Sequence, residues 1–329
     1  MKVFIFSTKP FEIPLLNRAN VNKHTLVFTE KRLTSETAVL ALNCDAISIF
    51  SADDPSTIVL EKLKTFGVKY ITLRSAGHDN INIKIANKLN FRIANTPSYS
   101  PNAIAEHAIT LLLAFNRNII KANRQTLDYN FLLDHLIGFD LKDKIVGVMG
   151  TGKIGCVLVK ILHGFGCKIL ANDVGSNEYL IKNFNAEYIS KDAIANEAEI
   201  IFICLPLNQV THHLFNTAYI NKLTKKPIIV NIARGAIVKA EDILKALDTN
   251  KISGYATDVY EKEHGVFFYD RSNNVPQDET LQKLIHHPKT LLTPHQAFAT
   301  NEALQNIAQA TFENINAWEE GKHAINELT

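Results

Sequence analysis

Three side chains suited to handling a small organic acid lie in the last third of the chain: Arg234, Glu263 and His295. Each follows an apolar run that predicts a buried strand. The runs are 228–232, 254–257 and 290–293. Because ligands bind outside the carboxyl ends of the strands in an open parallel sheet, we expect the three side chains to share one site.

The three residue types suit the reduction of a 2-keto acid. A guanidinium holds a carboxylate with two hydrogen bonds, so Arg234 would anchor the substrate and polarise its carbonyl. His295 would donate a proton to the carbonyl oxygen, and a hydrogen-bonded Glu263 would stabilise the imidazolium. A nicotinamide would supply the hydride. In reverse, neutral His295 would be the base that oxidises a 2-hydroxy acid.

Each of these residues also has a plainer interpretation. Arg234 could form a surface ion pair, His295 a structural hydrogen bond, and Glu263 a solvated loop carboxylate. Other catalytic arrangements find no support, because the chain lacks a GxSxG serine elbow near a His–Glu pair. The adjacent histidines at 212–213 and 286–287 lack metal-ligand spacing, so we expect loop or surface positions for them and no metal.

A glycine-rich stretch could hold the nicotinamide cofactor. Gly150, Gly152 and Gly155 form a GxGxxG pattern between the apolar run 145–149 and residues at helical spacing. Asp173 ends the next predicted strand about 18 residues after the last glycine, close to the spacing of a dinucleotide-binding unit.

Each part of this pattern has a physical role. Gly150 permits a tight turn, Gly152 lets the backbone approach a pyrophosphate, and Gly155 lets the helix pack close to the strand. The helix N-terminus would attract the phosphates. Asp173 would bind the ribose hydroxyls and repel a 2′-phosphate, which favours NAD over NADP. The alternative is a glycine-rich turn in an ordinary βα unit.

The composition is that of a globular protein, since 46% of the 329 residues are hydrophobic and 21% are charged. A net charge of +2 gives no reason to expect nucleic acid or a membrane surface as a partner. The four cysteines contain no CxxC pair, which favours free thiols in a reducing compartment. The first apolar run is too short for a signal peptide, and none spans a membrane, so we expect a cytoplasmic protein.

The length predicts about two domains, and the first hundred residues alternate short strands with helices. We predict strands at 3–6, 46–50, 70–73 and 91–94, and helices at 57–65, capped by Ser56, and 83–89. A break with two prolines at 95–102 precedes a long apolar helix over 103–123. A last helix, over 301–321, would cross back to the first domain.

We therefore expect an α/β fold with two doubly wound parallel-sheet domains, Rossmann-like and flavodoxin-like, with a cleft between them. The substrate-binding domain would contain residues 1–100 and 299–329. The NAD-binding domain would contain residues 101–298.

With these motifs in order, the chain resembles the D-isomer-specific 2-hydroxyacid dehydrogenases over essentially its whole length. The resemblance lies in the glycine loop with Asp173, in 231–235, in 258–263, and in the Thr-Pro-His sequence that ends at His295. Further stretches are similar to the fermentative D-lactate dehydrogenases of that family. They are 74–77, 97–108, 267–273 and 295–298.

The resemblance implies further site residues. The N–H groups of Ala76 and Gly77 would bind the substrate carboxylate with Arg234, and Tyr99 and Phe298 would line a small pocket for the substrate side chain. The cofactor would also contact Lys153, Ile154, Leu205, Pro206, Thr211, Ile232, Ala233 and Asp258. Members of the family form homodimers, sometimes paired into homotetramers. This chain departs from the family at His78, where an apolar residue is expected, and at Val174, where proline is common.

The resemblance thus implies an NAD-dependent reduction of pyruvate to D-lactate. Two alternatives remain. A relative acting on a larger 2-keto acid, such as phenylpyruvate or 2-ketoisocaproate, would need a wider pocket than Tyr99 and Phe298 suggest. An NAD(H)-sensing corepressor of similar fold would carry disordered tails or a peptide-binding extension, and the sequence has neither.

Overall fold

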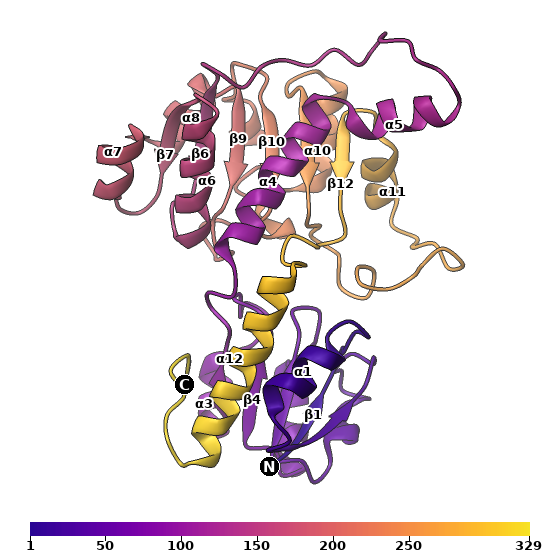
Figure 1. Ribbon diagram of the computed structural model, residues 1–329, viewed down its shortest axis with the longest axis vertical. Helices are drawn as coiled ribbons and strands as arrows, with labels where there is room; N and C mark the ends of the chain where they lie inside the picture. The colour runs from indigo at the N-terminus through magenta and orange to yellow at the C-terminus, as the bar shows by residue number, and fades with distance from the viewer. The chain divides into compact units, whose positions relative to one another are not determined.

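The computed structural model describes all residues from 1 to 329, which form two compact units (Figure 1). Unit 1 contains Met1–Ser100 and Phe298–Thr329, and unit 2 contains Pro101–Ala297. Each unit is built on one parallel sheet. The predicted α/β fold with two doubly wound parallel sheets is confirmed.

The sheet of unit 1 has five strands in the order β2-β1-β3-β4-β5, the flavodoxin-like order. The strands are β1 (Lys2–Ile5), β2 (Thr25–Phe28), β3 (Ala46–Ile49), β4 (Tyr70–Leu73) and β5 (Arg92–Ala94). The helices are α1 (Ile13–Asn20), η1 (Ala38–Ala41), α2 (Thr57–Thr65), α3 (Ile83–Lys88) and α12 (Asn301–Glu319). Short runs of apolar residues form these strands because both faces of the sheet are buried.

The last helix completes the core of unit 1. Phe312, Ile315 and Trp318 of α12 are buried in one cluster with Val3 and Ile5 of the first strand. The other face of the sheet is covered by a separate cluster that includes residues of η1, α2 and α3. The last helix thus covers one face of the N-terminal sheet.

The sheet of unit 2 has seven parallel strands in the order β12-β11-β10-β9-β6-β7-β8. The strands are β6 (Ile145–Met149), β7 (Lys168–Asn172), β8 (Glu187–Tyr188), β9 (Ile200–Ile203), β10 (Ile228–Asn231), β11 (Gly254–Thr257) and β12 (Thr290–Leu292). The helices are α4 (Pro101–Asn116), α5 (Ile119–Leu127), α6 (Lys153–Gly164), α7 (Glu178–Phe184), α8 (Lys191–Glu197), α9 (Thr217–Ile220), η2 (Gly235–Ile237), α10 (Ala240–Asp248) and α11 (Glu279–His286). From β6 the chain adds β7 and β8 on one side of the sheet, and then β9 to β12 on the other side. A doubly wound sheet binds its ligand at this switch point, between β6 and β9.

The predicted helix over 103–123 is wrong, because two helices occupy this segment. Asn118 adopts the left-handed conformation with φ 51°, which ends the helical path between α4 and α5. The side chain of Asn116 bonds both the N–H and the C=O of Phe139, at 3.0 and 2.7 Å, and so ties the end of α4 to a later segment. The apolar α4 buries eight of its residues, whereas α5 buries none.

Three further differences concern single positions or short elements. Ser56 occupies the N-cap position of α2, but its side chain makes no capping hydrogen bond. Phe298 belongs to unit 1 rather than to the NAD-binding segment, since its ring packs 5.6 Å from that of Phe50. Helix α1 and strand β2 were not predicted at all. The four cysteines are free thiols, and none of the helices combines the length and apolar character that crossing a bilayer requires.

Candidate active site

The predicted His295–Glu263 pair forms at the carboxyl edge of the unit 2 sheet. His295 Nδ1 lies 2.7 Å from Glu263 Oε1, and the two side chains are 17% and 15% exposed. The second carboxylate oxygen of Glu263 accepts a hydrogen bond from the N–H of Tyr260 at 3.0 Å. Because an ionised carboxylate only accepts hydrogen bonds, Nδ1 carries the proton in this contact and Nε2 is left to act on a ligand.

The turn that carries His295 is fastened to Asp258, which follows β11. The Asp258 carboxylate accepts hydrogen bonds from Thr293 Oγ1 at 2.5 Å, Gln296 N at 2.9 Å and Ala297 N at 2.8 Å. These donors flank His295 on both sides. His295 itself has φ 56°, a left-handed conformation that residues other than glycine rarely adopt. Asp258 therefore fixes the backbone on which the imidazole stands.

His107 of α4 supports the same carboxylate. Its Nε2 lies 3.4 Å from Asp258 Oδ1 and 3.2 Å from Thr293 Oγ1. Burial disfavours the charged form of Asp258, which is only 1% exposed, but hydrogen bonds from His107 and Thr293 and the nearby His295 outweigh it. The pKa of the Asp258 carboxyl is therefore held below its ordinary value, and the group is ionised at neutral pH.

Arg234 follows β10, the strand that pairs with β11. Its turn is shaped by Asn231, whose side chain accepts from Ala233 N and donates to the Arg234 carbonyl, both at 3.1 Å. A Cβ on Gly235 would lie 2.0 Å from the carbonyl carbon of Tyr260, so only glycine lets the Arg234 turn touch the loop that carries Glu263. Because β10, β11 and β12 are neighbours, Arg234, Glu263 and His295 occupy one edge of the sheet.

A second imidazole–carboxylate pair supports these loops. His213 Nε2 lies 2.9 Å from Glu261 Oε2, and Glu261 Oε1 accepts a hydrogen bond from Ala240 N at the start of α10. The N–H of His213 also donates to the carbonyl of Ala236. His213 lies in a loop, as predicted, but it joins the loop after β9 to the loops after β10 and β11.

The glycine loop connects β6 to α6, as predicted. Gly150 has φ 94°, and a Cβ there would approach the carbonyl oxygen of Cys204 to 2.6 Å. A Cβ on Gly155 would lie 2.0 Å from the Gly150 carbonyl oxygen, so this glycine lets the helix approach the loop. A Cβ on Gly152 would meet nothing within 4 Å. This open space at the helix N-terminus fits the diphosphate of a dinucleotide.

Asp173 follows β7 and bonds to the glycine loop. Its Oδ2 accepts from the N–H and the hydroxyl of Thr151 at 2.6 and 3.1 Å, and its Oδ1 accepts from Val174 N at 2.7 Å. Tyr188 donates to the same hydroxyl at 2.8 Å. Oδ1 accepts only one of these bonds and keeps a second lone pair, which fits a ribose hydroxyl.

The other predicted cofactor residues lie at the same edge of this sheet or in the loops that follow. Lys153 and Ile154 open α6, Leu205 and Pro206 follow β9, Thr211 bonds back to the Pro206 carbonyl at 2.6 Å, and Ile232 and Ala233 follow β10. The Asp258 carboxylate accepts hydrogen bonds from the turn that carries His295. Its contact with the cofactor stays a prediction.

In unit 1, Ala76 and Gly77 lie in the loop that follows β4. The carbonyl of Ser75 accepts from Thr96 N at 3.0 Å, that of Ala76 from Asn95 Nδ2 at 2.7 Å, and that of Gly77 from Ser75 Oγ at 2.7 Å. The N–H groups of Ala76 and Gly77 donate to no group of the protein. Two free neighbouring N–H groups suit a bound anion.

Arg74, at the start of this loop, anchors it to the core of unit 1. The side chain is 1% exposed, and its guanidinium bonds Glu12 Oε1 at 3.1 Å, Ser48 Oγ at 3.0 Å and the Phe6 carbonyl at 2.9 Å. All three bonds lie within the core, so Arg74 holds the end of β4 and does not face a ligand.

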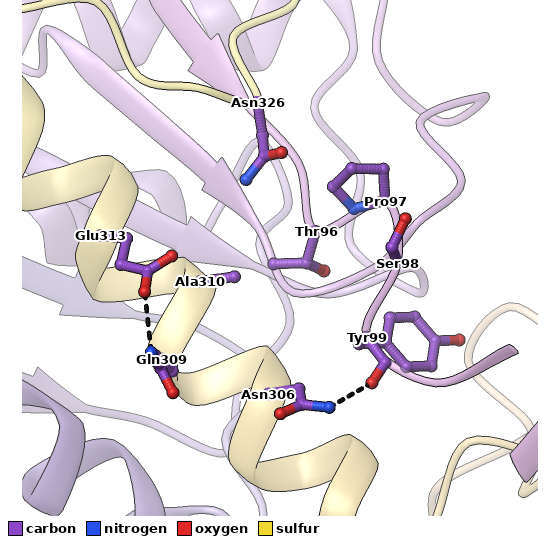
Figure 2. Close-up of a pocket in the computed structure, with 9 residues that line it drawn as sticks. All are labelled: Thr96, Pro97, Ser98, Tyr99, Asn306, Gln309, Ala310, Glu313 and Asn326. Atoms are coloured by element: carbon purple, nitrogen blue, oxygen red, sulfur yellow. Dashed lines mark hydrogen bonds between the residues drawn. The ribbon is translucent and has the colours of Figure 1, made fainter. Parts of the chain in front are cut away.

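Tyr99 and Phe298, the predicted side-chain pocket, both belong to unit 1. Figure 2 shows Tyr99 beside α12, where Asn306 donates to its carbonyl at 2.6 Å. Tyr99 also lines a pocket of about 250 Å³ on this helix. The imidazole of His78, on the loop after Gly77, is exposed to solvent.

Sequence reasoning missed the residues that support the site. The sequence motifs include His107 only as part of the segment 97–108. A lone histidine in the apolar α4 could have predicted a buried polar partner for its ring. Asn95 and Gly235 carry no such signal, because their roles depend on contacts with distant segments.

Comparison with known proteins places the chain among characterised enzymes. Residues 109–297 match the family model described as D-isomer specific 2-hydroxyacid dehydrogenase, NAD binding domain. The chain is 39% identical to the D-lactate dehydrogenase of Escherichia coli strain K12 over 329 residues, which cover 100% of both proteins.

Solved structures agree with this comparison. The pyruvate reductase of Chlamydomonas reinhardtii matches with a TM-score of 0.91 and 32% identity, covering 99% of this chain and 98% of that one. The NAD-complexed D-isomer specific 2-hydroxyacid dehydrogenase of Lactobacillus delbrueckii ssp. bulgaricus matches with a TM-score of 0.79 and 28% identity, covering 100% of both chains.

Proposed function

Because the chain belongs to the D-isomer-specific 2-hydroxyacid dehydrogenase family, we propose that it is a D-lactate dehydrogenase, which reduces pyruvate to D-lactate with NADH and also runs in reverse. The chain is an NAD-dependent D-2-hydroxyacid dehydrogenase; pyruvate as its substrate is the proposed part. Full-length similarity to a D-lactate dehydrogenase and to a pyruvate reductase supports that part.

The observation that carries the proposal is the 2.7 Å contact of His295 with Glu263, on the strand edge that also bears Arg234. In the proposed mechanism Arg234 holds the substrate carboxylate and polarises the keto group. His295, protonated on both ring nitrogens, gives its Nε2 proton to the carbonyl oxygen and becomes neutral, with the remaining proton on Nδ1. Glu263 accepts the hydrogen bond from Nδ1, stabilises the imidazolium and holds the ring in the orientation that leaves Nε2 to the substrate. NADH, when bound, supplies the hydride.

The residues of unit 1 complete the proposed substrate contacts. We assign the N–H groups of Ala76 and Gly77 to the substrate carboxylate and the rings of Tyr99 and Phe298 to its methyl group. The glycine loop and Asp173 would hold the NAD diphosphate and ribose. We also propose a cytoplasmic location and a homodimer or homotetramer. The apolar side chains exposed along residues 119–139 support the oligomer.

The test is NADH oxidation, followed by absorbance, with pyruvate, phenylpyruvate and 2-ketoisocaproate in parallel, and chiral analysis of the products. We expect pyruvate to give the highest kcat/KM and D-lactate to be the product. Preference for a bulky keto acid would keep the mechanism and replace the substrate. Binding of NADH without turnover of any keto acid would contradict the proposal and favour an NAD(H)-sensing role.

A further inference from the structure

The loop that holds Ala76 and Gly77 is bonded to the side chain of Asn95, and Asn95 is in turn bonded to Asn314 and Asn326. We propose that Asn95 is a positioning residue for substrate binding, which orients the N–H groups of this loop, and that Asn314 and Asn326 hold Asn95 in place. The inference rests on the proposed function, because it assigns those N–H groups to the substrate carboxylate.

The orientation of the loop follows from the planarity of its peptide groups. In a trans peptide, the N–H points away from the C=O of the preceding residue. Asn95 Nδ2 holds the Ala76 carbonyl at 2.7 Å, so it sets the direction of the Gly77 N–H. The neighbouring residue, Thr96, holds the Ser75 carbonyl through its N–H at 3.0 Å and sets the direction of the Ala76 N–H in the same way.

The backbone of Asn95 is itself bonded to the side chain of Asn314 and to the main-chain carbonyl of Asn326. Asn314 Nδ2 donates to the Asn95 carbonyl at 3.1 Å, and Asn95 N donates to the Asn326 carbonyl at 3.3 Å. Asn326 Nδ2 then donates to Asn314 Oδ1 at 3.4 Å, which closes the arrangement. Asn95 is 4% exposed and Asn314 is fully buried, so water does not compete for these bonds.

The amide side chain suits this position chemically. It supplies a strong N–H donor without a charge, so it orders the loop and leaves the anion to the backbone N–H groups. Asn326 is visible beside the Tyr99 pocket in Figure 2, on the C-terminal segment that runs along β5. This segment pairs through an antiparallel bridge between Ala94 and Glu327, and through a bond of 2.7 Å from Leu328 N to the Ile93 carbonyl.

The test replaces Asn95 by leucine, which has a similar size and no donor. Losing one positioning hydrogen bond corresponds to about a five- to tenfold change in affinity. We therefore expect Asn95→Leu to raise the KM for the keto acid and the inhibition constant of oxamate about tenfold. The Kd of NADH, measured by fluorescence, should stay within about twofold, because the glycine loop lies in unit 2. Asn314→Ala, which removes the donor to the Asn95 carbonyl, should raise the keto-acid KM by about threefold.

The matched control is Asn316→Leu, on α12 two residues after Asn314. Asn316 Oδ1 lies 2.9 Å from His24 Nε2, away from the loop, so its loss should change thermal stability without changing the keto-acid KM. An unchanged KM in folded Asn95→Leu, or a parallel loss of NADH affinity, would overturn the proposal. If Asn95→Leu does not fold, Asn314→Ala decides, because it removes the side-chain donor to the Asn95 carbonyl, and an unchanged KM there overturns the proposal. The wild type is assayed first on several keto acids, so failure of the proposed function is seen before any variant is compared.

Discussion

His295 retains one ring nitrogen for chemistry because Glu263 engages the other. The glycine loop and Asp173, which we propose for the dinucleotide, follow other strands than His295 does. We therefore expect mutation to separate proton transfer from cofactor binding.

Replacing His295 with glutamine should remove the proton donor and keep the side-chain volume. We expect kcat for keto-acid reduction to fall by at least about a hundredfold, with the Kd of NADH unchanged. Steady-state kinetics and fluorescence titration measure the two quantities. His286→Gln, at an exposed histidine that contacts only the Gln282 carbonyl, is the control and should keep full activity. Near-normal turnover of His295→Gln would exclude it as the proton donor.

Two glycines of the glycine loop should affect different properties of the protein, one its NADH affinity and the other its stability. Gly152→Val should leave the melting temperature nearly unchanged, because a Cβ there meets nothing within 4 Å, while the larger side chain occupies the space proposed for the diphosphate. NADH affinity should fall by about tenfold or more. Gly155→Ala should instead destabilise the protein, because its Cβ would lie 2.0 Å from a carbonyl oxygen. Thermal melts and NADH titrations of both variants check the contrast, and equal losses of stability would contradict it.

For single residues, the sequence predicts well the roles of side chains that directly follow a predicted strand. His295, Glu263 and Arg234 were placed by their strands alone, and their shared edge follows from the order β10-β11-β12. The support by His107 and Asn95 depends instead on which distant segments meet. His107 and Thr293 are 186 residues apart, and no spacing pattern in the sequence predicts a hydrogen bond between such distant residues.

At the scale of elements, Gly235 lets the loop after β10 pack directly against the loop after β11. Gly235→Ala would push the Arg234 turn away from the loop that carries Glu263, because the new Cβ would lie 2.0 Å from the carbonyl carbon of Tyr260. We expect kcat/KM to fall by about tenfold or more and the melting temperature to fall. Gly175→Ala, where a Cβ meets nothing within 4 Å, is the matched control. Full activity of Gly235→Ala would show that the two loops need not touch.

The C-terminal segment is fastened to β5 by an ion pair with a defined pH dependence. Glu327 lies 2.7 Å from Arg92 and also accepts from Ala324 N and Trp318 Nε1. Burial alone would raise the pKa of Glu327, but these bonds lower it from 4.5 to about 2. Because the folded pKa lies below the unfolded one, the stabilisation is present above pH 4.5 and is lost as the pH falls towards 2.

Glu327→Gln should therefore lower the free energy of unfolding at pH 7 by about 2 kcal/mol. The difference from wild type should shrink as the pH falls from 4.5 to about 2. Denaturant titrations across this range provide the measurement. Glu36→Gln, at an exposed carboxylate of the same unit, should match wild type throughout. A difference that does not depend on pH would contradict the assignment to Arg92.

Element boundaries were predictable where an apolar run and a breaker coincide. The strand over 70–73 and the helix over 57–65 have their predicted limits. The helix over 103–123 failed because its break depends on Asn118 in a left-handed conformation and on Asn116 bonding to Phe139. Strand β2 was missed because none of its four residues is fully buried and it lies at the sheet edge.

For the whole molecule, the exposed apolar segment after α4 predicts self-association. Phe131, Leu133 and Ile137 are 71%, 74% and 86% exposed, an arrangement that is typical of an interaction surface. We expect light scattering to give at least twice the 36.8 kDa mass of one chain. The double variant Phe131→Glu, Leu133→Glu should have the mass of one chain. Ile325→Glu, at an equally exposed site of unit 1, should not change the mass, and a monomeric wild type would contradict the expectation.

The discontinuity of unit 1 has a consequence for how the protein is made. Its first hundred residues leave the ribosome early, yet α12, which covers one face of their sheet, is encoded only at 301–319. Until that helix emerges, Val3, Ile5 and Ala46 lack the part of their cluster that α12 supplies, which includes Phe312, Ile315 and Trp318. Unit 2, which is contiguous, can fold during this interval. The nascent chain thus carries an unfinished N-terminal sheet through most of translation, and this sheet is the surface that a ribosome-associated chaperone would protect.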